Sequence, residues 1–193
     1  ETINSAVPLY DQSRPYQQIP FQYSLHVQSS KAASPIHTSF LAEGNGQDPR
    51  EALIKRMIKD LGETGTILTY NMGFEKGVIN KLAIDFPQYA DALQSINARI
   101  NDLAIPFRSY YYHTKDMRGS WSIKAVLPAL VPHLSYNDLV IQEGGTASAT
   151  FLSMTTGTFD GNITETRANL EAYCELDTLA MVEILKVLYG VTK

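Results

Sequence analysis

The sequence is poor in the residues that crosslink small domains. It has one cysteine, Cys174, among its 193 residues, so no disulfide can form within the chain. Its four histidines, His26, His37, His113 and His133, are scattered without the Cys/His spacing of a zinc site, and we expect each of them to be structural. These scarcities predict a reducing, cytoplasmic location and a buried thiol at Cys174.

Long hydrophobic runs and a surplus of positive charge are also missing. No run reaches the roughly 18 apolar residues of a transmembrane helix, and residues 1–4 lack the order of a signal peptide, so we expect no membrane partner. The 16 Lys and Arg against 20 Asp and Glu give a net charge of -4, which argues against a protein that coats nucleic acid non-specifically. A local basic groove beside an acidic metal site is compatible with this net charge.

The remaining composition is that of a globular protein. With 44% hydrophobic residues, the chain is long enough for one well-packed domain, and we expect residues 1–193 to form a single α/β domain. Alternating and helical periodicities follow a first loop over residues 1–20. The expected elements are a hairpin (21–27 and 36–41), a strand (66–70), a connector with some strand character (134–141) and helices over 49–61, 75–86, 89–100, 122–131, 147–154 and 164–189.

The last of these helices carries an acid on its apolar stripe. Tyr173, Cys174 and Asp177 share the helix face that the leucines and isoleucines of this helix bury. Burying a carboxylate costs several kcal/mol unless a positive group or a set of donors meets it, so Asp177 requires a partner such as a metal ion. The structural alternative is that Asp177 turns to the edge of the stripe and makes a local cap or salt bridge.

A second acid, Glu75, stands at the head of the apolar face of the helix over residues 75–86. If both helices pack on one sheet, Glu75 and Asp177 can meet. Oxygen ligands of this kind suit Mg²⁺ or Mn²⁺ rather than zinc.

The segment over residues 107–124 mixes aromatic and basic side chains. Tyr112 and Trp121 are candidates for stacking on bases, and Arg118 and Lys124 for phosphate contacts, as in proteins that bind single-stranded nucleic acid. The alternative is that the tyrosines pack inward and the charges are only solvated.

Two short motifs resemble those of a nuclease superfamily. Tyr173-Cys-Glu-Leu-Asp177 resembles the third motif of the tyrosine subclass of DEDD 3′–5′ exonucleases, whose fold is ribonuclease H-like, and Asn71-Met-Gly-Phe74-Glu75 resembles the second motif, with Glu in place of its last Asp. Glu1-Thr2 resembles the end of the first motif, Asp-x-Glu-Thr. The resemblance therefore implies a mixed sheet flanked by helices, with most of the first strand and the first-motif Asp lying before Glu1.

A closer resemblance covers nearly the whole chain. Residues 14–24, 48–50, 70–75, 119–128 and 173–181 are similar to the bacterial family known as domain of unknown function 2779. In larger proteins that family's region follows a RecB-like nuclease module, which the resemblance implies as a partner.

The superfamily resemblance also implies roles for individual residues. Glu1, Glu75 and Asp177 would hold two Mg²⁺ or Mn²⁺ ions, with Asp102 as a further candidate ligand or, equally, a helix-end residue. Tyr173, with Glu75 and Asp177, would be catalytic and orient the attacking water, and Asn71 would position the nucleotide at the scissile bond.

The implied function is metal-dependent 3′–5′ hydrolysis of single-stranded nucleic-acid ends, impaired in residues 1–193 alone. The alternative is a degenerate ribonuclease H-like domain that binds nucleic acid or a partner nuclease without cleaving. A plain scaffold is a third hypothesis.

Overall fold

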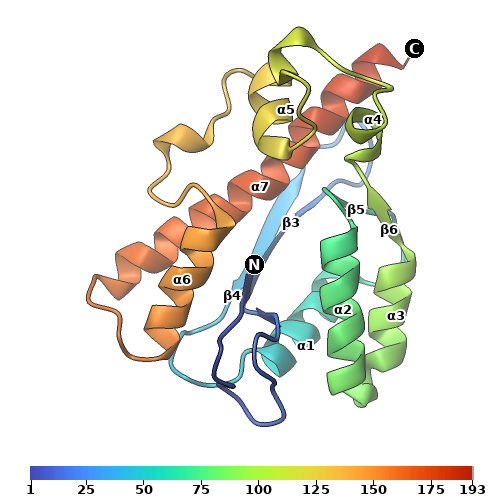
Figure 1. The fold of residues 1–193 in the computed structure, drawn as a ribbon. Coiled ribbons are helices and arrows are strands. Elements are labelled where there is room, and N and C mark those ends of the chain that lie inside the picture. Colours follow the sequence, from blue (N-terminus) through green and yellow to red (C-terminus); the bar gives the residue numbers. More distant parts are fainter. Residues whose placement is uncertain (193) are drawn as a thin grey trace.

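The computed structural model of the protein describes residues 1–192 and shows a mixed α/β architecture. In Figure 1, α5, α6 and α7 lie on one side, α2 and α3 lie on the other side with β5 and β6, and the β3–β4 hairpin lies behind. The strands are β1 (Thr2–Ile3), β2 (Ile19–Pro20), β3 (Gln22–Val27), β4 (Ile36–Leu41), β5 (Ile67–Thr69) and β6 (Ile100–Asp102). The α-helices are α1 (Arg50–Leu61), α2 (Gly73–Asp85), α3 (Ala90–Ala98), α4 (Ile105–Arg108), α5 (Ile123–Leu130), α6 (Gly144–Thr155) and α7 (Ile163–Val191), and three short 3₁₀ turns cover Pro87–Tyr89, Lys115–Met117 and Tyr136–Asp138.

The strands form three two-stranded sheets rather than one continuous mixed sheet. The predicted hairpin is confirmed: β3 and β4 are antiparallel, with Gln22 opposite Leu41 and His26 opposite His37. The strand predicted over residues 66–70 is confirmed as β5, and its partner is β6, which runs parallel to it. The mixed α/β class is therefore confirmed, whereas the sheet is divided.

Several predicted boundaries were wrong. Residues 100–102, predicted to end a helix, form strand β6, because the helix ends at Ala98 and the next residues pair with β5. Residues 1–20, predicted as a loop, contain β1 and β2, which pair antiparallel over two residues each. The connector over residues 134–141 contains a 3₁₀ turn in place of a strand.

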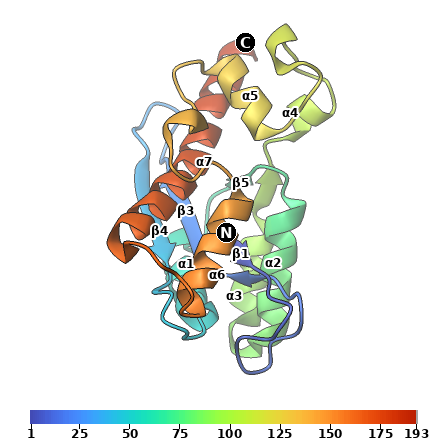
Figure 2. The same cartoon turned by 60° about the vertical axis from the view of Figure 1, so that its left-hand side comes forward.

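Helix α7 is the longest element, at 29 residues, and Figure 2 shows it lying along the β3–β4 hairpin. It begins at Ile163, one residue before the predicted start, and is capped by Asn162, whose side-chain oxygen accepts the Glu165 N–H at 3.2 Å. Gly190, predicted to end the helix, lies inside its last turn. Gln22 Nε2 donates to the Leu170 carbonyl at 2.8 Å and links β3 to this helix.

The buried side chains form two clusters. One is formed by the face of α7 together with α5, α6, β1, β2 and the base of the hairpin, and includes Phe21 stacked on Phe151 at 4.1 Å between ring centroids. The other is formed by α1, α2 and α3 and includes Ile54, Leu82 and Leu93. The face predicted for α7 is confirmed as buried, since Leu170, Tyr173, Cys174 and Ile184 all belong to the core.

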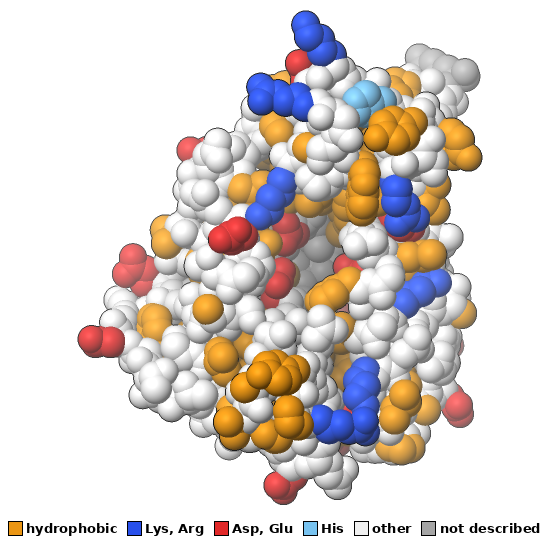
Figure 3. Space-filling model, viewed as in Figure 1, with side chains coloured by type: hydrophobic (Ala, Val, Ile, Leu, Met, Phe, Trp, Pro, Cys, Tyr) orange, Lys and Arg blue, Asp and Glu red, His pale blue; other side chains and the backbone are white. Residues whose placement is uncertain are grey.

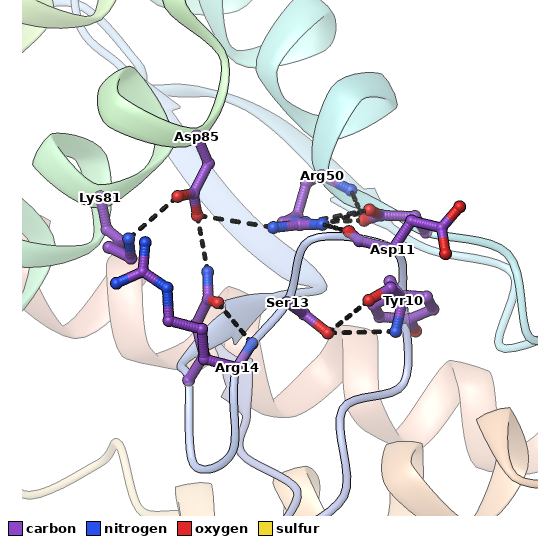
Figure 4. A network of polar contacts seen from close by, with 9 residues as sticks. Tyr10, Asp11, Ser13, Arg14, Arg50, Lys81 and Asp85 are labelled. Carbon is purple, nitrogen blue, oxygen red and sulfur yellow. Dashed lines mark hydrogen bonds and ion pairs between the residues drawn. The ribbon is translucent and has the colours of Figure 1, made fainter.

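The Asp48-Pro49-Arg50 motif has a structural role (Figure 4). Arg50, which is only 3% exposed, donates to both carboxylate oxygens of Asp48, to the Asp11 carbonyl at 3.2 Å and to Asp85 at 3.5 Å. Lys81 pairs with the same Asp85 at 2.9 Å. The arginine therefore joins the N-terminal segment, α1 and α2 through one buried guanidinium.

Among the helices of residues 1–192, none has the length and apolarity to cross a membrane.

Candidate active site

A hollow opens in the middle of the face shown in Figure 3, with acidic side chains inside it and Lys and Arg side chains on both sides of its upper rim. The chain begins at this place, between α6 and α7 on one side and β5 and α2 on the other (Figure 1). Glu1 is held there by its backbone: its carbonyl accepts the Phe21 N–H at 3.0 Å and its amino group donates to the Gln22 carbonyl at 2.5 Å.

Asp177 faces this region from α7 together with two tyrosines. Tyr136 donates its hydroxyl to Asp177 Oδ1 at 2.6 Å, and Tyr173, one helical turn earlier, lies beside the same carboxylate with its ring 6.1 Å from that of Tyr136. Burial raises the pKa of Asp177, the hydroxyl of Tyr136 lowers it, Glu1 raises it again and Tyr173 lowers it. The expected Tyr173–Asp177 juxtaposition is present, and Asp177 does not turn away to a surface salt bridge.

Glu75 lies in the first turn of α2, and the pKa of its carboxyl is strongly raised. Burial raises its pKa from 4.5 to about 7, and the nearby Asp102 also raises it. Its Oε2 atom is buried and makes no hydrogen bond of ordinary geometry among the described residues, although a backbone N–H and the neighbouring Thr69 hydroxyl are near enough to lower the pKa of the carboxyl. A buried carboxylate oxygen without a donor is costly, so this side chain is available for a cation.

Glu1 acts electrostatically on Asp177, because its carboxylate raises the pKa of that acid. The carboxylate lies against the start of α6, where a Cβ on Gly144 would stand 3.1 Å from Glu1 Oε2. A helix N-terminus attracts negative charge, and the glycine leaves room for it.

Asp102, the further candidate ligand, is engaged by other groups. Its Oδ1 accepts the backbone N–H groups of Asn71 and Ala104, each at 2.9 Å, and Arg108 lies 3.4 Å from its Oδ2. Asn71 has a left-handed backbone (φ 69°), which this hydrogen bond fixes at the turn before α2. The geometry favours a structural role for Asp102, at the end of β6 rather than of a helix.

The acids do not converge on one tight point. Within residues 1–192, the one group of three potential ligands whose atoms lie within 4.8 Å of one another is His26, His37 and Glu175, at the hairpin. The carboxylate of Glu1 is close enough to Asp177 to raise its pKa, whereas the acid that raises the pKa of Glu75 is Asp102. The histidines lack ligand spacing in the sequence, and the hairpin register brings His26 and His37 opposite each other.

Sequence patterns gave no sign of two residues of this region. Tyr136 has no motif around it, and only its hydrogen bond to Asp177 reveals its role. Gly144 belongs to a glycine pair that resembles an incomplete phosphate loop, and its contact is with Glu1 instead. The signal that could have found Gly144 is a glycine at the first position of a helix.

The comparisons with known proteins give the family. The family described as "Domain of unknown function (DUF2779)" matches residues 1–122, which is more than half of the chain. The chain belongs to the DUF2779 family. The chain is also similar to the "Uncharacterized protein MG366 homolog" of Mycoplasma pneumoniae (strain ATCC 29342 / M129 / Subtype 1), with 28% identity over 201 residues covering 95% of this chain. The chain spans about 30% of the length of that relative. No solved structure matches the chain.

The family match contains Glu1, Asn71 and Glu75 but ends before Tyr173 and Asp177. It also contains most of the aromatic and basic segment. Trp121 is 37% exposed with the Arg108 guanidinium 5.8 Å from its ring, and its carbonyl accepts the Tyr70 hydroxyl at 2.6 Å.

The other three candidates of the segment differ in exposure. Tyr112 is half-buried and packs edge-on against Phe107, so for this tyrosine the inward alternative holds. Arg118 and Lys124 are exposed. Lys124 donates to the Gln142 carbonyl at 2.9 Å and lies 5.8 Å above the Tyr136 ring.

Lys124 also connects two hollows along α5. One, of about 610 Å³, is lined by Lys124, Tyr136, Gln142 and Glu143 among others. The other, of about 480 Å³, is lined by Arg118 and Lys124. The two hollows therefore share Lys124, and the first also contains Tyr136, whose hydroxyl donates to Asp177.

Proposed function

We propose that this region is the active site of a metal-dependent 3′–5′ exonuclease with a ribonuclease H-like fold, acting on single-stranded nucleic-acid ends. One observation carries the proposal. Glu75 of α2 and Asp177 of α7 are both held where burial raises the pKa, and the carboxylate of Glu1 raises the pKa of Asp177 further. Acids in ion pairs that only stabilise the fold would have lowered pKa values. Burying Glu75 and Asp177 with raised pKa values costs folding free energy, which suggests that they have a functional role.

The donor set fits Mg²⁺ or Mn²⁺. All three groups are carboxylates, which hard divalent cations prefer, and the unpartnered Oε2 of Glu75 offers a buried ligand atom. The proposed site would hold two ions, about 3.5–4 Å apart, between these carboxylates. When bound, such ions would activate the attacking water and stabilise the leaving oxygen.

The chain's own residues would supply the remaining functions. Tyr173, beside Asp177, would orient the water that attacks the terminal phosphodiester, and Tyr136 would hold the Asp177 carboxylate in place. Asn71 would contact the terminal nucleotide, Trp121 would stack on a base, and Lys124 would contact a phosphate of the strand.

The test compares the full-length protein with Asp177→Asn on single-stranded DNA and RNA labelled at the 5′ end, in Mg²⁺, Mn²⁺ or EDTA. We expect stepwise shortening from the 3′ end that requires the metal, and a loss of roughly 100-fold or more in the variant. Glu171→Gln, an exposed acid on the same helix, is the matched control and should retain activity. Wild-type protein as inactive as Asp177→Asn in both metals would reject the nuclease function.

The alternative function predicts a different pattern. The exposed Trp121, Arg118 and Lys124 favour it equally, because a domain that only binds nucleic acid needs the same surface. In that case fluorescence anisotropy would detect binding of an oligonucleotide that is indifferent to EDTA and to Asp177→Asn. A RecB-like nuclease module elsewhere in the full-length protein would then be the enzyme that this domain serves.

A further inference from the structure

Two histidines and a glutamate from three elements meet where the hairpin packs against α7. His26 of β3 and His37 of β4 are directly opposite in the antiparallel register, and their ring centroids are 4.7 Å apart. Glu175 of α7 places its Oε1 atom 3.7 Å from His37 Nδ1. One potential ligand atom from each of the three residues lies within 4.8 Å of the other two.

Two hydroxyl groups fix the orientation of the imidazoles. Thr178 Oγ1 lies 2.9 Å from His26 Nδ1, Ser24 Oγ lies 2.9 Å from His37 Nε2, and the two hydroxyls are 2.7 Å apart. Each ring therefore has one nitrogen bonded to a hydroxyl and a second nitrogen that can bind an ion. Histidines that bind metals are usually held in this way, through a hydrogen bond from the nitrogen that is not the ligand.

The two faces of α7 separate this cluster from the acidic region. Glu175 is two residues from both Tyr173 and Asp177, which on a helix is a rotation of about 200°. Accordingly, Glu175 and Thr178 face the hairpin, whereas Tyr173 and Asp177 face Tyr136. An ion at the hairpin would therefore not share ligands with one held by Asp177.

The cluster is open enough for an ion to enter, since the side chains of His37 and Glu175 are 29% and 49% exposed. Two imidazole nitrogens and one carboxylate oxygen make a ligand set that suits Zn²⁺ rather than Mg²⁺, with water as a fourth ligand. We propose that His26, His37 and Glu175 bind one Zn²⁺ ion, which joins β3 and β4 to α7. This proposal is independent of the proposed nuclease function.

The test is calorimetric titration of the tag-free chain with ZnCl₂, with Asp177→Asn as background to weaken metal binding in the acidic region. We expect one equivalent to bind, and His37→Ala to weaken binding by roughly 100-fold or more. Thr178→Val should weaken it by roughly 10–100-fold, the usual cost of removing a residue that orients a metal ligand. The double variant His113→Ala/His133→Ala, which removes two exposed histidines, is the control and should bind as tightly as its parent.

Glu175→Gln tests whether a loss of binding is caused by misfolding rather than by loss of a ligand, because Glu175 is half-exposed and its replacement leaves the core unchanged. At 100-fold excess over the dissociation constant, Zn²⁺ should raise the melting temperature of the parent by roughly 5–10 °C, and that of Glu175→Gln by much less. Zn²⁺ binding that is unchanged in both His37→Ala and Glu175→Gln, or a Co²⁺ spectrum with the thiolate band of Cys174 as ligand, would overturn the proposal.

Discussion

The charge on Glu75 should destabilise the metal-free protein. Burial raises the pKa of this carboxyl from 4.5 to about 7 in the folded chain, so folding favours its protonated form. The stabilisation from this group is fully present below pH 4.5 and is lost as the pH rises through about 7. Glu75→Gln keeps the shape of the side chain without the charge. The free energy of unfolding of this variant should therefore not fall as the pH rises from 4.5 through about 7.

The difference between the two pKa values sets the magnitude. Linkage at about 1.36 kcal/mol for each pKa unit gives a cost of about 1 kcal/mol at pH 5 and about 3 kcal/mol at pH 8 for the charged wild-type residue. Urea unfolding in EDTA at these two pH values measures it. Glu75→Gln should exceed wild type in stability by an amount that grows with pH, and at pH 8 its melting temperature should be higher by roughly 6–12 °C.

Two comparisons make the result decisive. Glu171→Gln removes one negative charge from an exposed position and should show no such growth with pH. Adding Mg²⁺ at pH 8 should stabilise wild type more than Glu75→Gln, because the carboxylate becomes a ligand. If Glu75→Gln is no more stable than wild type at pH 8 in EDTA, the burial argument for this acid is refuted.

Three further changes test other contacts. Arg50→Ala removes the hydrogen bonds of a buried guanidinium to Asp48, Asp85 and the Asp11 carbonyl and should cost about 1.5–3 kcal/mol of unfolding free energy in urea, and a loss below 1 kcal/mol would contradict the structural role of this arginine. Tyr136→Phe removes a hydrogen bond that lowers the pKa of Asp177, so the carboxyl should titrate at higher pH in carbon-13 NMR, and an unchanged titration would show that the bond is absent in solution. Burial raises the pKa of Cys174 to about 12, so a thiol reagent should modify it slowly in the folded protein and fast in urea, whereas immediate reaction would show an exposed thiol.

Sequence periodicity predicted the elements that bury one face. The hairpin and α1, α2 and α7 have apolar residues at the spacing of their secondary structure, and each is present. Strand β6 was missed because it has three residues and directly follows a helix, so no alternation can develop. Pairing with β5 decides its conformation, and such a long-range contact leaves no local pattern.

The same distinction applies to the candidate site. Glu75 and Asp177 stand out in the sequence because an acid interrupts an apolar stripe. Tyr136 and Gly144 interrupt nothing, and their importance depends on what lies opposite them in space. His26 and His37 are eleven positions apart, and only the register of the hairpin turns that separation into a direct pair.

Helix α7 shows why one stripe on a helical wheel was an incomplete description. Between Tyr173 and Thr178 it presents Asp177 to Tyr136 on one side and Glu175 and Thr178 to the hairpin on the other. Because this stretch makes polar contacts on two sides, only a narrow strip of its surface is apolar. Cys174 lies on this strip and is 6% exposed. Packing before and after the stretch, at Leu170 and Ile184, must therefore hold the helix in place, and each of these side chains is fully buried. Truncating either one should disturb both polar clusters together, whereas a change at Asp177 or Glu175 should disturb only its own.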